Sequence, residues 1–201
     1  MSAHGPRQTV SVPDFEAAYV ALRSTLKAGI LAHASVKALD AMDPAEHIAA
    51  IENELLVAFE KWKPRVRDAD DFCSVRFEWA GADVAPYVPQ DVWSKGYAGD
   101  PFQGVVGTPR AILFREAPGF EPRPLGLLKD AIDEDLEEMP DEVFDGLKEM
   151  FVARSLAWAA RALSSAMHRP EFKALRPVSP FHFLASPGHD EGTLVLGVWQ
   201  R

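Results

Sequence analysis

The residues from Lys129 to Glu149 carry almost all of the net charge of the chain. This segment has ten acidic residues and two lysines, a net charge of −8, and the whole chain of 201 residues has a net charge of −9. Clustered carboxylates attract a cationic surface and speed its encounter with the protein. We therefore expect a basic protein partner to contact the following residues: Asp130, Asp133, Glu134, Asp135, Glu137, Glu138, Asp141, Glu142 and Asp145.

A second explanation of the acidic segment needs no partner. Acidic side chains near a helix N-terminus complement the positive end of the helix dipole, and a charged surface keeps a protein in solution. A calcium loop is disfavoured, because the spacing of Asp133, Asp135 and Glu137 requires a glycine next and position 138 is Glu138. The sequence alone leaves both explanations of the charge open.

Two histidines near the end of the chain are the next candidates for chemistry. His182 lies between two phenylalanines of a strand-like run, and His189 precedes two acidic residues in a turn. Imidazole transfers protons near neutral pH and binds metals. The gap between these histidines matches no recurrent spacing of metal ligands, so we expect no metal site and no cofactor.

The sequence has no signature of nucleophilic catalysis. It lacks a Gly-x-Ser-x-Gly motif, and nothing near Cys73 marks a reactive thiolate, so we expect a small buried sulfur there. We therefore expect a binding protein rather than an enzyme. The alternative is a small-molecule enzyme or ligand-binding domain in which His182 and His189 act as acid and base.

An aromatic segment over residues 80–109 is a further candidate contact surface. It has five glycines and four prolines in thirty residues, so no long helix can run through it. Trp93 and Tyr97 are the residues in it that we expect to contact the partner, because aromatic side chains supply large contact area at low entropy cost. Packing of this segment onto the sheet is the alternative, and the enzyme hypothesis places its pocket beneath the segment.

Composition argues against several classes of protein. The chain has 30 acidic residues against 21 Lys plus Arg, which disfavours binding to nucleic acid. No window approaches the roughly 18 apolar residues of a membrane span, and residues 1–10 lack the apolar core of a signal peptide. A single cysteine cannot form an internal disulfide, which is typical of a reducing compartment. These features predict a cytoplasmic protein that binds neither nucleic acid nor membrane.

The order of the predicted elements indicates an α+β fold. Two helices, two strands, two helices and two strands follow one another, which predicts an antiparallel sheet of about four or more strands covered by about four helices. Apolar residues make up 47% of the chain, enough for one core. We expect a flexible N-terminus over residues 1–10 and a single domain over residues 11–201.

Cap residues and apolar spacing predict the helices. The first helix begins near Ser11 and Asp14, and the second begins at Asp43 with Pro44 in its first turn. Pro64 is expected to stop the second helix, because proline lacks a backbone N–H. The predicted ranges are 11–30, 43–64, 125–139 and 140–170.

Alternating apolar residues predict strands at 72–79, 111–115, 178–185 and 193–199. We expect the first two strands to pair across the aromatic segment and the last two to form a hairpin. The last strand is apolar on both faces, which predicts a central position in the sheet.

Three features of the last fifty residues carry a resemblance to a known family. They are the end of the long helix at Phe172 and Leu175, the strand Ser179-Pro180-Phe181-His182-Phe183 and the turn His189-Asp190-Glu191. In these features the chain resembles the small acidic immunity proteins that bacteria encode beside polymorphic toxins. The resemblance implies a non-catalytic protein that occludes a toxin surface, and it carries over no catalytic residue.

Overall fold

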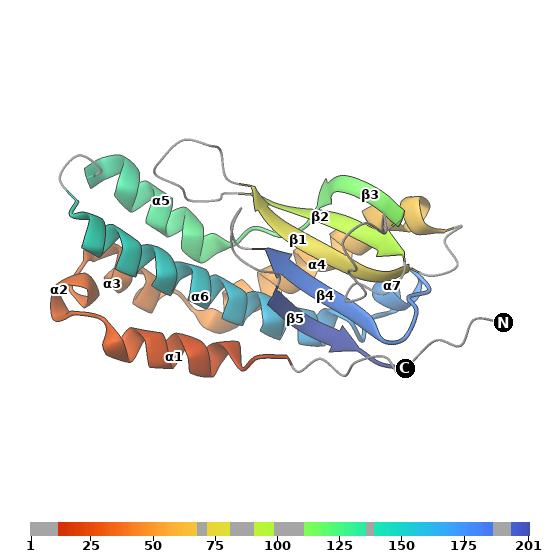
Figure 1. Cartoon of the computed structure of the whole chain (residues 1–201), viewed down its shortest axis with the longest axis horizontal. Helices are drawn as coiled ribbons and strands as arrows, with labels where there is room; N and C mark the ends of the chain where they lie inside the picture. The colour runs from red at the N-terminus through yellow and green to blue at the C-terminus, as the bar shows by residue number, and fades with distance from the viewer. Residues whose placement is uncertain (1–11, 68–71, 81–90, 99–110, 136–138, 187–193) are drawn as a thin grey trace.

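A computed structural model describes residues 12–67, 72–80, 91–98, 111–135, 139–186 and 194–201. The chain has an α+β fold, as the sequence predicts (Figure 1). The helices are α1 (Phe15–Thr25), α2 (Ala28–Leu31), α3 (Ala34–Ala41), α4 (Pro44–Val66), α5 (Arg123–Asp135), α6 (Asp141–Ala166) and α7 (Pro170–Lys173). The strands are β1 (Phe72–Ala80), β2 (Asp91–Ala98), β3 (Ala111–Pro118), β4 (Phe181–Ser186) and β5 (Leu194–Trp199).

Along the long axis of the molecule, one end consists of helices alone and the other end consists of the sheet with the helices that cover it (Figure 1). Helices α4 and α6 pack together, α4 contacts β3 and α6 contacts β5. Helix α6 extends beyond the sheet, where α1, α2 and α5 pack against it (left in Figure 1). None of the helices that the structure describes combines the length and the apolar character that crossing a bilayer requires.

The five strands form one sheet in the order β3-β2-β1-β4-β5. Three neighbouring pairs are antiparallel, but β1 and β4 are parallel, with Ser74 opposite His182. The expectation of an antiparallel sheet is therefore wrong at this pair. The physical reason is the long helical connection between β3 and β4, because a crossover of this kind lets a later strand run parallel to an earlier one.

Strand β2 lies inside the aromatic segment, where no strand was predicted. It pairs with β1 on one side and β3 on the other, so the expected direct pairing of residues 72–79 with 111–115 is wrong. Gly96 of β2 lies opposite Phe114, and the Phe114 ring fills the space beside the glycine. This glycine therefore marks a close packing contact within a strand and not a turn.

Strand β5 is an edge strand, which corrects the prediction of a central position. It forms the expected antiparallel hairpin with β4, with Phe181 opposite Trp199. Leu196 and Trp199 are buried, and α6 contacts this strand. A helix that covers an edge strand buries its apolar side chains as effectively as a second neighbouring strand, so burial alone does not reveal strand order.

The predicted first helix is divided in the structure. Ser11, whose hydroxyl was the expected cap, lies outside the described residues. Helix α1 is capped by Asp14, which accepts a hydrogen bond of 3.0 Å from the Ala17 backbone N–H. The chain leaves the helix at Leu26, and α2 and α3 follow as separate helices. Helix α3 was not predicted; His33 caps it by accepting a 3.3 Å bond from Ser35 N–H, and histidine is an uncommon cap.

Helix α4 begins at the predicted residue but ends later than predicted. Asp43 accepts a hydrogen bond of 2.9 Å from Ala45 N–H, and Pro44 occupies the first turn. Pro64 lies inside the helix, which continues to Val66. Val66 is 2% exposed, so its burial holds the last turn in place although the proline removes one backbone donor.

The long helix α6 ends at Ala166, before the predicted limit at Pro170. Pro170 instead begins the short helix α7, a position in which its missing N–H costs nothing. Phe172 and Leu175 are buried, but they do not belong to the long helix, which corrects the helix ending assumed in the family resemblance.

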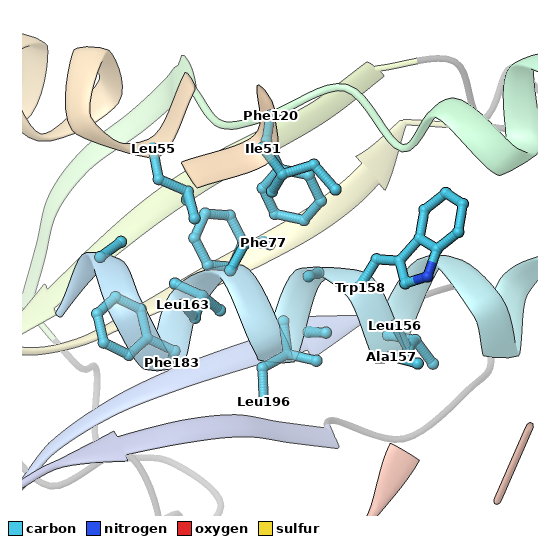
Figure 2. Close-up of a cluster of buried hydrophobic side chains, with 14 of the residues drawn as sticks. Ile51, Leu55, Phe77, Phe120, Leu156, Ala157, Trp158, Leu163, Phe183 and Leu196 are labelled. Carbon is cyan, nitrogen blue, oxygen red and sulfur yellow. The ribbon is translucent and has the colours of Figure 1, made fainter. Parts of the chain in front are cut away.

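Aromatic rings fill the core between helices and sheet. Figure 2 shows side chains from α4, α6, β1, β4 and β5 converging. The ring centre of Phe59 in α4 lies 5.4 Å from that of Phe172 and 6.5 Å from that of Phe183. Trp62 is fully buried and its Nε1 donates a 3.0 Å hydrogen bond to the Pro118 carbonyl, so the polar atom of this indole is paired.

Candidate functional site

The predicted acidic residues fall on two helices. Those on α5 are Asp130, Asp133, Glu134 and Asp135. Those on α6 are Asp141, Glu142, Asp145 and also Glu149, all exposed. Glu137 and Glu138 lie outside the described residues. Asp135 of α5 and Asp141 of α6 are six residues apart, so their Cα atoms lie within about 22 Å of each other.

The helix dipole favours the two acids in the first turn of α6. Asp141 and Glu142 occupy the first turn of α6, next to the positive end of its dipole. Asp133, Glu134 and Asp135 lie in the last turn of α5 that the structure describes, and that turn has no basic residue. The helix dipole therefore explains Asp141 and Glu142, whereas the acids of α5 are explained by solubility or by a partner.

A groove between α1 and α6 adjoins the acids of α6. Its volume is about 490 Å³, and its lining is Leu22, Asp145, Lys148, Glu149, Val152, Ala153 and Leu156. On α6, the residues Asp145, Glu149, Val152 and Leu156 follow at intervals of four, three and four. This spacing forms one stripe along the helix, in which two carboxylates precede two apolar side chains. The groove thus combines an apolar surface with a negative end.

Arg154 fixes α1 against α6 close to this groove. Its guanidinium forms an ion pair of 2.6 Å with Glu16 of α1 and lies 4.1 Å from the ring centre of Tyr19. The Arg154 side chain is only 18% exposed, so water screens these interactions less than it would on an open surface. The wall that α1 contributes to the groove is therefore held in place.

Helix α1 is held from a second side by α3. Arg23 of α1 donates two hydrogen bonds of 2.6 Å to the two carboxylate oxygens of Asp40 and one of 2.9 Å to the Tyr19 hydroxyl. The bonds from Arg23 hold the pKa of Asp40 below its ordinary value, although partial burial acts in the opposite direction. These contacts make α1 a firm part of the helical end rather than a loose N-terminal segment.

Two cations lie among the acids of α6. Lys27 forms an ion pair with Glu142, and because these side chains are 70% and 68% exposed the pair contributes little stability. Lys148 lines the groove between Asp145 and Glu149 in the sequence. These two lysines leave the four α6 acids with a negative excess, and like charges at intervals of four residues on a helix repel.

Trp93 and Tyr97 lie in strand β2 and not in a loop. In the register of the sheet Trp93 is opposite Glu78 and Tyr97 is opposite Ser74. Strand β2 belongs to the sheet, whereas the groove lies at the helical end (Figure 1). The structure therefore does not bring the aromatic and acidic candidates together.

His182 is buried in the middle of the sheet. Its neighbours Phe181 and Phe183 point to the helix-covered face, and the alternation of a strand directs His182 to the opposite face, with 4% exposure. His182 does not line the groove, and it does not line a second cleft, which is formed by Lys173, Arg176, Pro177, Trp199 and Arg201. His189 lies outside the described residues, and Cys73 is buried, as expected. Among the described residues, no three His, Cys, Asp or Glu side chains are placed to hold a metal ion.

Comparison of the chain with protein-family models, curated proteins and solved structures found no match. The acids of α6 are evident from the sequence, but the groove beside them is not. The spacing of Asp145, Glu149, Val152 and Leu156 is a signal that could have found the α6 wall, but nothing local indicates that Leu22 forms the other wall.

Proposed function

We propose that this protein binds a basic protein partner through the acids of α5 and α6 and the adjoining groove, without catalysing a reaction. Lysine and arginine side chains of the partner meet the carboxylates, and an apolar side chain enters the groove between Leu22 and Leu156. The charges would direct the encounter and the apolar contact would slow dissociation.

The observation that carries this proposal is the groove between α1 and α6, where the exposed carboxylates of Asp145 and Glu149 adjoin the apolar side chains of Val152 and Leu156. Like charges four residues apart on a helix repel each other. Features that cost stability and serve no folding purpose are expected at functional sites. A cationic partner would remove the electrostatic cost of these residues.

The resemblance of the last fifty residues to immunity proteins implies a toxin as the basic partner. In this form of the proposal the protein acts in the cytoplasm of the cell that makes the toxin. Neutralisation then results from covering a toxin surface, so it requires no catalytic group on this chain.

Titration with a synthetic probe tests the binding chemistry. The probe is a helical peptide of lysines and leucines at amphipathic spacing, measured by calorimetry at low and at high salt. We expect the affinity to fall as salt rises, and to fall at least tenfold in the double variant Asp145→Lys/Glu149→Lys. Ala153→Met changes no charge but fills the groove, so it should weaken the same peptide and spare a peptide in which serines replace the leucines.

The matched control is Glu46→Lys/Glu60→Lys, which reverses two exposed acids on α4. It changes the net charge by the same amount as the groove variant. Equal losses in the two double variants would mean that only the total charge matters, and an affinity independent of salt would rule out the electrostatic mechanism. Either result contradicts the proposed site.

A further inference from the structure

A second cleft lies at the opposite end of the molecule from the acids of α6. Its volume is about 380 Å³, and its lining is Lys173, Arg176, Pro177, Trp199 and Arg201. The lining comes from the end of α7, the connection to β4 and the end of β5. In Figure 1 these elements lie at the right, while the first turns of α6 lie at the left.

Hydrogen bonds fix the backbone that surrounds this cleft. Val178 N–H donates to the Phe72 carbonyl at 2.8 Å, which ties the connection before β4 to β1. Arg201 N–H donates to Ser179 Oγ at 3.0 Å, which ties the end of β5 to the same connection. Trp199 is 8% exposed and its ring centre lies 5.7 Å from that of Phe172. The cleft therefore has a largely preformed aromatic wall.

Three cations surround the cleft, and among the described residues no acidic side chain lines it. Within the part of the chain that the structure describes, Lys173, Arg176 and Arg201 have no carboxylate within ion-pair distance, whereas nearby Arg169 pairs with Glu52 at 2.7 Å. Like charges around one concave site repel one another, and a concave site focuses their field. An anion in the cleft would relieve this repulsion.

Arg176 occupies a backbone conformation that favours glycine. Its φ angle is 55°, in the left-handed region, three residues after the end of α7. A residue with a Cβ atom is strained there. Backbone strain of this kind is found most often at functional sites.

From the three cations of this cleft and its aromatic wall we infer that the cleft binds a small organic anion, with a carboxylate or phosphate group attached to a flat apolar body. The guanidinium of Arg176 and the ammonium of Lys173 hold the charged group, since guanidinium matches the geometry of both oxyanions. Trp199 and Pro177 contact the apolar body. The volume lies within the range of small-molecule sites in proteins. This site is separate from the acidic groove and does not depend on the proposed protein partner.

Calorimetric titration of the full chain with phenyl phosphate and with benzoate tests the inference, and benzamide is the neutral control. We expect saturable binding of one or both anions with a stoichiometry of one, and none of benzamide. The tighter of the two anions identifies the charged group. Binding of benzamide equal to that of the anions, or failure of both anions to saturate, would overturn the inference.

Arg176→Gly, Lys173→Gln and Lys37→Gln complete the experiment. Arg176→Gly removes the guanidinium and relaxes the backbone, so anion binding should weaken at least tenfold while the unfolding temperature does not fall. Lys173→Gln should also weaken binding tenfold. Lys37→Gln, on exposed α3, removes one charge elsewhere and should leave the affinity unchanged. Unchanged binding in Arg176→Gly, or equal losses in all three variants, would refute the site.

Discussion

Gly146 of α6 lies directly against the side chain of Ile30 in α2. A Cβ atom at position 146 would be 2.7 Å from Cδ1 of Ile30 and 3.4 Å from Cδ2 of Leu26. Glycine is unfavourable inside a helix, and here it allows α2 to approach α6 one residue after the groove acid Asp145. The close approach positions the helical end that carries the acids of α6.

Replacement of Gly146 by alanine should therefore destabilise the protein by about 1 kcal/mol. Overpacking lowers the free energy of unfolding by about 1–3 kcal/mol, and the better helix propensity of alanine offsets about 1 kcal/mol of this loss. Ile30→Val deletes the Cδ1 atom that meets the new methyl group. We expect the double variant Gly146→Ala/Ile30→Val to be more stable than the sum of the single effects predicts, as measured by urea denaturation. Additive effects would contradict the contact.

The Arg23–Asp40 pair predicts a stability that depends on pH. Because the pKa of Asp40 is lowered in the folded state, the pair stabilises the protein above the ordinary aspartate pKa of about 3.9, and this contribution is lost as pH falls through the folded value. Asp40→Asn should cost about 0.5–1 kcal/mol at pH 7. The difference between this variant and the wild type should shrink below pH 4 in denaturation curves. A difference that stays constant with pH would exclude the carboxylate as its cause.

Gly96 should not tolerate alanine, whereas Gly197 should. A Cβ atom at Gly96 would lie 2.3 Å from Cε1 of Phe114, and that ring is packed 5.6 Å from the Trp62 ring. Gly96→Ala should cost about 2 kcal/mol or more. At Gly197 the nearest atom to a Cβ would be 3.8 Å away, on Phe183. Gly197→Ala should be neutral or stabilising by about 0.5 kcal/mol, because alanine suits a strand better than glycine. Equal losses at both positions would disprove this packing argument.

The acids of α5 predict a stability that depends on salt. The variant Asp133→Asn/Glu134→Gln/Asp135→Asn removes three neighbouring like charges from α5, so it should raise the free energy of unfolding by about 1 kcal/mol at low salt. Asp141→Asn/Glu142→Gln, at the positive end of the α6 dipole, should lower it. Both changes should diminish at high salt, in thermal melts of the two variants. Stabilisation by the second variant instead of the first would contradict this account of the charges.

Local chemistry determined much of the secondary structure. Asp43 followed by Pro44 predicts the start of α4 correctly, because a cap side chain and a proline each act within one turn of the helix. The alternation in residues 72–79 predicts β1 correctly, with Val75 and Phe77 buried. The high density of acids around residues 129–149 is likewise a property of the sequence alone.

Contacts between distant residues decided the rest. Strand β1 is parallel to β4 although about one hundred residues separate them, and only the packing of the helical crossover selects that pairing. From the sequence alone Gly96 resembles a loop residue, but in the folded chain the Phe114 ring packs against it. Leu22 and Leu156 line one groove, and Arg176 and Trp199 line one cleft, only in the folded chain. Such juxtapositions depend on the sum of many weak contacts over the whole core, and no short stretch of sequence contains that sum.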